Sequence, residues 1–225
     1  MTTQQDAQAV FQTVSDGGVA VFGVDVGYAI VGHSEDAIGR IFSIKRRSFG
    51  KPCGCFGNWE MFEQIIDADE SARRFVSAVI HDNDLPLSIV GRYRPEHPIL
   101  ANAPAFTRKH ATKGDTMDLL MNAGPRHDAL ADLALAAGRG VFGSSANMSL
   151  GGSKYAFDAV EAELRTGADL ALDCGATRYS HPGGLGSTII DLDTMRPFRI
   201  GIAFDHIRQI AADTCGIEIP DEVIA

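Results

Sequence analysis

The stretch Val141-Phe142-Gly143-Ser144-Ser145-Ala146-Asn147-Met148-Ser149 carries the clearest information on the fold. A short apolar run ends at Phe142 and leads into small polar residues, and Gly151 and Gly152 follow before a helix can start. We predict a buried strand that ends in a polar turn. Hydroxyl, amide and backbone N–H groups at such a strand end can hold phosphate or carbonyl oxygens. A capped turn without a ligand is the alternative, because Ser and Asn are ordinary turn residues.

The composition sets the protein class. The chain has 225 residues, of which 45% are hydrophobic and 22% charged, as is typical of a soluble globular protein. The net charge of −9 argues against a broad basic surface for nonspecific nucleic-acid binding, although it is compatible with a local basic groove. Four scattered cysteines predict reduced thiols in a cytoplasmic protein. Residues 1–18 contain no basic side chain and no apolar run is long enough to span a membrane, so we expect neither a targeting peptide nor a membrane partner.

Hydrophobic periodicity predicts a mixture of helices and strands. Helices are expected at 6–14, 34–46, 59–66, 71–81, 126–138, 155–166 and 204–212. Strands are expected at 19–22, 53–56, 87–90, 117–121, 168–172, 187–192 and 198–202, the last two as a hairpin. Three prolines interrupt residues 91–114, which we interpret as a long surface segment. Hairpin-like pairs break a strict helix–strand alternation, so we predict one α/β (α+β-like) domain with a mixed sheet over residues 1–225.

Two further stretches carry polar chemistry at the ends of predicted elements. Lys45, Arg47 and Lys51 lie at a helix end and in the loop after it, where they suit a triphosphate. They also suit the negative end of the helix dipole, so a purely structural role is an open alternative. No Walker-type phosphate loop is present, because Gly50-Lys51 is followed by Pro52. No HExxH, GxSxG or paired-cysteine motif is present either, so we expect no metal site made by side chains.

The third stretch is Gly186-Ser187-Thr188-Ile189-Ile190-Asp191-Leu192, with Arg199-x-Gly201 on the strand after it. Together with Lys45-x-Arg47-x-x-x-Lys51-Pro52 and Ser145-Ala146-Asn147-x-Ser149, in this order, it resembles the YrdC-like family of threonylcarbamoyl-adenylate synthases over about residues 17–202. The resemblance implies a twisted mixed sheet around a deep, positively lined cavity. It also implies a nucleotidyltransferase that converts ATP, bicarbonate and L-threonine into threonylcarbamoyl-AMP and pyrophosphate, in the synthesis of N6-threonylcarbamoyladenosine in tRNA.

The resemblance also implies roles for individual residues. The residues that match ATP-holding positions are Arg47, Lys51, Ser145, Asn147 and Arg199, and Lys45 and Arg47 are the candidate catalytic pair. Asp25, Tyr28 and Ser187 match the amino-acid side of the site. Mg²⁺ is expected to bind mainly through phosphate oxygens.

Departures from the family pattern fall mostly on the amino-acid side. The segment Gly23-Val24-Asp25-Val26-Gly27-Tyr28-Ala29 keeps the acid and the aromatic but lacks both threonines of the family signature, and Ala123-Gly124-Pro125 replaces Arg-x-Pro. We therefore expect a conserved nucleotide half and an altered amine or amino-acid acceptor, unless Arg126 restores the guanidinium in a shifted register. The alternative is a non-catalytic nucleotide- or double-stranded-RNA-binding protein with RNA or tRNA-modification partners. Its basic patch would be Arg92, Arg94, Arg108, Lys109, His110 and Lys113, which a solvated charged loop explains equally well.

Overall fold

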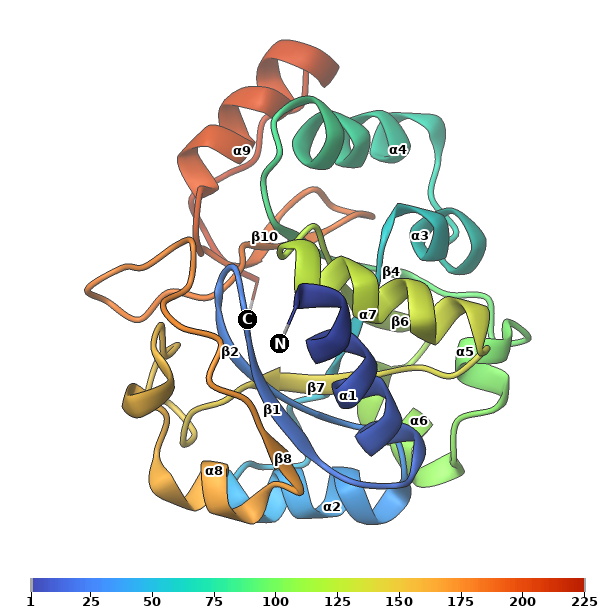
Figure 1. Cartoon of the computed structure of the whole chain (residues 1–225). Coiled ribbons are helices and arrows are strands. Elements are labelled where there is room, and N and C mark those ends of the chain that lie inside the picture. Colours follow the sequence, from blue (N-terminus) through green and yellow to red (C-terminus); the bar gives the residue numbers. More distant parts are fainter. Residues whose placement is uncertain (1, 225) are drawn as a thin grey trace.

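A computed structural model describes residues 2–224 of the chain as a twisted mixed sheet flanked by helices (Figure 1). The helices are Thr3–Ser15 (α1), Glu35–Ile44 (α2), Trp59–Ile65 (α3), Glu70–Ser77 (α4), Pro98–Ala101 (α5), Ala105–Ala111 (α6), Pro125–Ala136 (α7), Ala162–Gly167 (α8) and Phe204–Ile210 (α9). The strands are Ala20–Val24 (β1), Gly27–Gly32 (β2), Gly54–Phe56 (β3), Leu87–Arg92 (β4), Thr112–Lys113 (β5), Thr116–Met121 (β6), Phe142–Ser145 (β7), Leu170–Ala171 (β8), Ile189–Asp191 (β9) and Pro197–Arg199 (β10).

The sheet combines parallel and antiparallel pairs in the order β10-β9-β4-β6-β3-β7-β2-β1-β8, with β5 paired to β6. The pairs β3–β6, β4–β9 and β1–β8 are parallel, and the others are antiparallel. Strands β3 and β7 lie in the middle, so residues far apart in the sequence meet there. The mixed α/β fold and the β9–β10 hairpin predicted from the sequence are confirmed.

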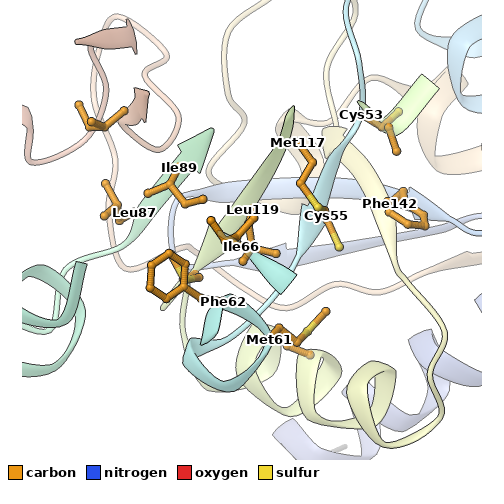
Figure 2. Packing of buried hydrophobic residues seen from close by; sticks show 14 of the residues in the cluster. Cys53, Cys55, Met61, Phe62, Ile66, Leu87, Ile89, Met117, Leu119 and Phe142 are labelled. Atoms are coloured by element: carbon orange, nitrogen blue, oxygen red, sulfur yellow. The ribbon is translucent and has the colours of Figure 1, made fainter. Parts of the chain in front are cut away.

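Alternation along β6 separates the hydrophobic core from the opposite face of the sheet. Met117, Leu119 and Met121 are buried, whereas the intervening Thr116, Asp118 and Leu120 are partly accessible. Figure 2 shows Met117 and Leu119 among the side chains of this core, which also takes in residues of α3, β3 and β4. The other face of β6 is therefore free to contribute to a cavity.

Helices pack against the sheet and against one another. Figure 1 shows α1 beside α7 and α2 beside α8. Ser34 caps α2 as predicted, since its Oγ accepts a hydrogen bond from the Ala37 N–H at 3.1 Å. The helix ends at Ile44, so that Lys45 to Pro52 leave it as a loop that leads to β3.

The structure corrects three expectations from the sequence. Residues 91–114 are not a long irregular segment, because they contain α5, α6, β5 and the end of β4 and bury Ile99 and Leu100 completely. The helix expected at 155–166 reduces to the 3-10 turn Phe157–Ala159 and α8. Strand β2 was not predicted, since every one of its residues is buried and its sequence shows no polar alternation.

Candidate active site

A cavity of about 340 Å³ lies on the face of the sheet opposite the main core. Small side chains leave the space for it, because Ala29, Gly54, Ser88, Gly143 and Ser145 line it where larger residues would fill the hollow. Position 143 requires glycine, since a Cβ atom there would overlap the main-chain oxygen of Ile30 on β2. The volume is within the range of small-ligand sites in proteins.

Arg47 and Lys51 bring positive charge to this cavity from the loop after α2. The loop is fixed by Arg47 itself, whose Nε donates to the Lys51 carbonyl at 3.2 Å and whose Nη2 donates to the Pro52 carbonyl at 2.7 Å. Burial lowers the pKa of Arg47, but a guanidinium stays charged across the physiological range. Lys51 is exposed, and Lys113 of β5 adds a third cation to the lining.

Arg199 of β10 faces the cavity from the other edge of the sheet. Its Nε donates to the Ser187 carbonyl at 2.8 Å and its Nη2 donates to the Ser187 Oγ at 2.8 Å, while that hydroxyl lies 3.2 Å from the Ser88 Oγ. Gly201 permits this close approach of the two chain segments, because a Cβ atom there would overlap main-chain oxygens of Gly186 and Ser187. The Arg199 guanidinium and the Ser187 and Ser88 hydroxyls thus form one hydrogen-bonded group at this side of the cavity.

Lys45 does not line the cavity. Its side chain is 1% exposed, and its Nζ donates to the Ser145 carbonyl and to the Asn147 carbonyl, the latter at 2.6 Å. Burial, followed by the charge of Arg47, lowers its pKa to about 8. The Lys45 ammonium therefore holds the turn after β7, and the catalytic role expected from the sequence stays a prediction.

The predicted polar turn after Phe142 is divided between the cavity and the interior. Ser144 and Ser145 belong to β7 and line the cavity. Asn147 is not among the lining residues, since its Nδ2 donates to the Met148 carbonyl at 2.6 Å. Its Oδ1 is buried and without a hydrogen-bond partner in the described part of the chain. Asn147 therefore stabilises the turn through its Nδ2, and its expected role in ATP binding stays a prediction.

The amino-acid side of the predicted site also differs from expectation. Tyr28 is among the lining residues, but its hydroxyl donates to the Gly175 carbonyl at 2.8 Å and accepts from the Cys174 N–H at 2.9 Å. Burial raises its pKa to about 12. Asp25 is not among the lining residues, and its carboxylate lies 3.7 Å from Arg178 Nη1. Burial raises the pKa of Asp25 against the lowering effect of Arg178.

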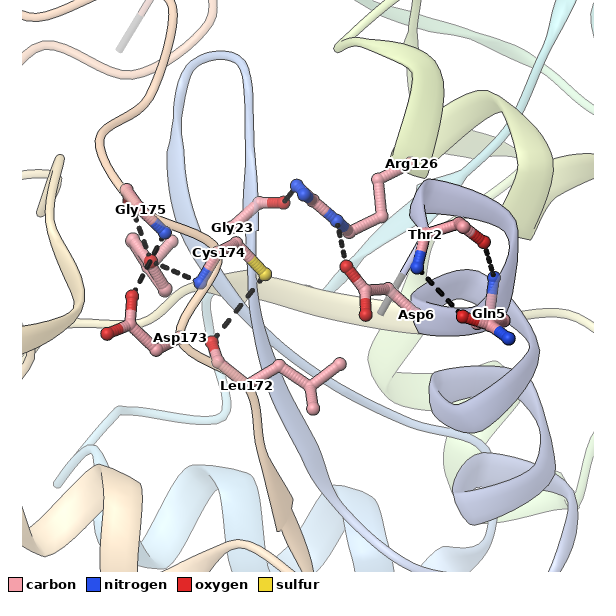
Figure 3. A network of polar contacts seen from close by, with 10 residues as sticks. Thr2, Gln5, Asp6, Gly23, Arg126, Leu172, Asp173, Cys174 and Gly175 are labelled. Carbon is pink, nitrogen blue, oxygen red and sulfur yellow. Dashed lines mark hydrogen bonds and ion pairs between the residues drawn. The ribbon is translucent and has the colours of Figure 1, made fainter.

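Arg126 does not restore the missing guanidinium. Its Nε donates to the Asp6 carboxylate at 3.0 Å and its Nη1 donates to the Gly23 carbonyl at 2.9 Å, which ties α7 to α1 and β1 (Figure 3). A different arginine, Arg178, reaches Asp25 from the segment after β8 and also pairs with Asp84 at 2.9 Å. Sequence reasoning did not identify Arg178, because no local pattern connects it with Asp25.

Asp118 is the cavity residue that the sequence interpretation overlooked. It projects from β6 in the middle of the sheet, opposite Gly54, where a Cβ atom would lie 3.0 Å from Asp118 Oδ2. Burial raises its pKa to about 6, against the lowering effects of Arg199, the Ser88 hydroxyl and Arg47. The available signal was the polar alternation Thr116-x-Asp118 in a strand whose other residues are apolar.

The cavity therefore gathers most, but not all, of the predicted site residues. Arg47, Lys51, Tyr28, Ser145, Ser187 and Arg199 line it, and Lys45, Asn147 and Asp25 do not. Within residues 2–224 no cluster of three or more His, Cys, Asp or Glu side chains could hold a metal ion. No helix in the described chain is long and apolar enough to cross a membrane.

The cavity in this mixed α/β sheet is lined by cations and hydroxyls, which are groups able to bind anionic ligands. The family profile Sua5/YciO/YrdC, described as telomere recombination, matches residues 12–201, so the chain belongs to this family. The YrdC-like resemblance predicted from the sequence is thereby confirmed. No curated protein matches the chain in sequence.

Solved structures share the fold at low sequence identity. Sua5 of P. abyssi in complex with L-threonine has a TM-score of 0.72 and 20% identity, over 98% of this chain and 60% of that one. This chain thus spans only 60% of the length of that Sua5 chain. YciO of E. coli has a TM-score of 0.61 and 22% identity, over 89% of this chain and 91% of that one. HypF in a phosphate- and nucleotide-bound form has a TM-score of 0.62 and 12% identity, over 85% of this chain and 28% of that one.

Proposed function

We propose that this protein binds ATP in the cavity and forms a carbamoyl-type adenylate from ATP, bicarbonate and an amine. The observation that carries the proposal is the convergence of Arg47 and Lys51, from the first third of the chain, with Ser145, Ser187 and Arg199 on one cavity. Family membership supports a role like that of a threonylcarbamoyl-adenylate synthase. The nucleotide and phosphate bound by HypF, and the L-threonine bound by Sua5, support ligands of this class.

The chemistry requires little covalent participation by the protein. Bicarbonate takes up a proton and loses water to give carbon dioxide, and the amine adds to it and releases a proton to form a carbamate. The carbamate oxygen attacks the α-phosphate of ATP, and pyrophosphate leaves. Arg47, Lys51 and Arg199 would neutralise the phosphates, and the Ser145 and Ser187 hydroxyls would orient oxygens that bear developing charge. Asp118 is the one carboxylate in the lining that the described residues provide, so Mg²⁺ would enter mainly with the phosphate oxygens.

The proposed acceptor is an amine that differs from the family's threonine. Both arginines near Asp25 are already paired, Arg126 with Asp6 and Arg178 with Asp84 and Asp25 itself. A substrate carboxylate on this side of the cavity would lack a charge-assisted bond of about 1.5–3 kcal/mol, which is roughly tenfold to a hundredfold in affinity. Amines without an α-carboxylate would lose no affinity from the missing guanidinium.

Pyrophosphate release from ATP and bicarbonate tests the proposal. The assay would compare L-threonine, other amino acids, simple amines and carbamoyl phosphate, with Arg47→Ala and Arg199→Ala as site variants and Lys109→Ala as a surface control. Acceptor-dependent release that both site variants abolish would support the proposed reaction. Free L-threonine that binds as tightly as ATP in calorimetry would contradict the altered acceptor, and the absence of ATP binding would refute the proposal as a whole.

RNA binding is a second candidate function, and one surface feature favours it. Phe49 is 55% exposed and packs against His110 and Phe106, with ring centroids 4.7 and 6.0 Å apart. Arg108 and Lys109 lie on the same helix as these two rings and form no ion pair within residues 2–224. An exposed aromatic ring beside cations suits an unpaired base and its phosphate.

The other half of the predicted basic patch is neutralised. Arg92 pairs with Asp193 at 2.8 Å, and Arg94 lies 3.6 Å from Asp67. An RNA site would therefore centre on Phe49 and α6. Phe49→Ala should then weaken RNA binding, whereas Arg92→Ala should leave it unchanged. RNA affinity that does not fall with rising salt would exclude this function.

A further inference from the structure

Asp118 lines the same cavity as Arg47 and Arg199. Arg199 and Arg47 both act electrostatically on its carboxylate, the first from β10 and the second from the loop after α2. The side chain projects from the cavity face of β6, and its Oδ1 is buried without a hydrogen-bond partner in the described part of the chain. In the ligand-free protein the two guanidiniums therefore favour the ionised form of the carboxylate, against the effect of its burial.

An anionic ligand must change this arrangement. Phosphate oxygens that bind Arg47 and Arg199 bring a second negative charge beside Asp118 and remove the compensation that the guanidiniums gave it. A like charge beside a carboxylate disfavours its ionisation and so raises its pKa. A carboxyl group that takes up a proton instead becomes a hydrogen-bond donor, and Asp118 lines the cavity in which the anionic oxygens would lie.

We propose that Asp118 is a ligand-binding residue that acts in its protonated form, donating a hydrogen bond from its carboxyl group to an anionic oxygen held by Arg47 and Arg199. The proton comes from solvent and is released when the ligand leaves. This inference deepens the proposed function and rests on its anion-binding part alone, not on catalysis.

Among the lining residues, Asp118 is the group to which a change of protonation near neutral pH can be assigned. The other lining residues that carry charged or titratable groups are Tyr28 on β2, Arg47 and Lys51 after α2, Cys55 on β3, Lys113 on β5 and Arg199 on β10. Neighbouring β4 contributes the Ser88 hydroxyl. Burial raises the pKa of the Cys55 thiol, and that of Tyr28 to about 12, so both stay neutral at neutral pH. No histidine lines the cavity in the part of the chain that the structure describes.

The direction of the pH dependence follows. Burial raises the pKa of free Asp118 to about 6, so below this value the carboxyl is already protonated and ligand affinity is constant. Above it, binding requires proton uptake, and affinity falls by about tenfold per pH unit until the pKa of the complex is reached. The side-chain amide introduced by Asp118→Asn would donate an N–H at every pH. The Asp118→Asn protein should therefore bind with a pH dependence that comes from the ligand alone.

The experiment measures the dissociation constant of metal-free ATP between about pH 5.5 and pH 8.5 for wild type and Asp118→Asn. Since the titration of ATP itself cancels in the ratio of the wild-type constant to the variant's, that ratio should be flat below about pH 6 and rise about tenfold per unit above it. Asp115→Asn, a nearby exposed carboxylate on the turn between β5 and β6, is the matched control and should follow wild type. A ratio that stays flat over the whole range would overturn the inference, and so would loss of binding by a folded Asp118→Asn protein at every pH.

A second measurement needs no variant. Calorimetry of wild type at about pH 8, in two buffers of different ionisation enthalpy, should show net proton uptake as ATP binds. Binding with no proton uptake would end the role of Asp118 but leave the proposed function intact. A wild-type protein that binds no ATP even at about pH 5.5 would overturn both.

Discussion

Replacement of Lys45 by methionine separates the structural from the catalytic interpretation of this residue. Lys45 is 1% exposed and donates to the carbonyls of Ser145 and Asn147. The Ser145 carbonyl also accepts from the Asn147 N–H at 3.0 Å, so it keeps one donor after the replacement. The Asn147 carbonyl is the acceptor that loses its ammonium. Methionine fills a similar volume, so the cavity contribution is small.

The magnitude follows from these contacts. Loss of a bond to a charged group, with a buried acceptor left over, costs about 1.5–3 kcal/mol, and the removal of a buried charge offsets part of it. We expect a net loss of about 1–2 kcal/mol, which for a chain of this size lowers Tm by about 2–8 °C. The Lys45→Met replacement should change the affinity for ATP less than Arg47→Ala does, because Lys45 does not line the cavity.

Differential scanning calorimetry and ATP titration on the same samples check this prediction. Lys109→Met, at an exposed position of α6, is the matched control and should shift stability by no more than about 0.5 kcal/mol. An unchanged Tm together with a loss of ATP affinity of more than about tenfold would refute the reasoning, because it would mean that the Lys45 ammonium acts on the ligand.

Three further outcomes are expected. Arg199→Ala should weaken ATP binding by about tenfold to a hundredfold in calorimetry with little change in Tm, and a larger effect on Tm than on affinity would assign Arg199 to the fold. Gly39→Ala in α2, where a Cβ atom meets nothing within 4 Å, should raise the free energy of unfolding in urea by about 0.5–1 kcal/mol, whereas Gly143→Ala should lower it by about 1–3 kcal/mol. Burial lowers the pKa of Lys45 to about 8 from 10.5, so the unfolded chain binds more protons between these values. The stability of wild type relative to Lys45→Met should therefore rise with pH across that window, and a constant difference would contradict it.

Local signals predicted those elements whose stability is itself local. The Ser34 cap and the apolar spacing of α2 located that helix, and the β9–β10 hairpin followed from its short turn. Strand β2 was missed because it is buried on both faces, so that tertiary packing and not alternation determines it. The short helices α5 and α6 have four and seven residues, too few for a helical period to stand out.

In the candidate site, too, the sequence predicted some features and missed those that depend on tertiary packing. Sequence order brought Arg47, Ser145 and Arg199 together as one hypothesis, and all three line the cavity. The sequence could not distinguish Lys45 from Arg47, because both are cations two positions apart at a helix end. Their difference is one of direction, since Lys45 points under the turn after β7 and Arg47 points along the loop into the cavity. Burial of this kind depends on strands about a hundred residues away and leaves no local pattern.

The arginines on the acceptor side show how the same residue type can be present and still be unavailable. Arg126 holds α1 and β1 together through Asp6 and the Gly23 carbonyl, so its release would expose a buried ion pair. Arg178 is shared between Asp25 and Asp84, so a substrate carboxylate would have to displace two acids to reach it. Breaking existing charge pairs costs about as much as the new pair returns, and the net gain is therefore small. Within residues 2–224, the cations available to bind an anion in the cavity are those of the phosphate side, which favours an acceptor recognised by its amine and shape instead of by a carboxylate.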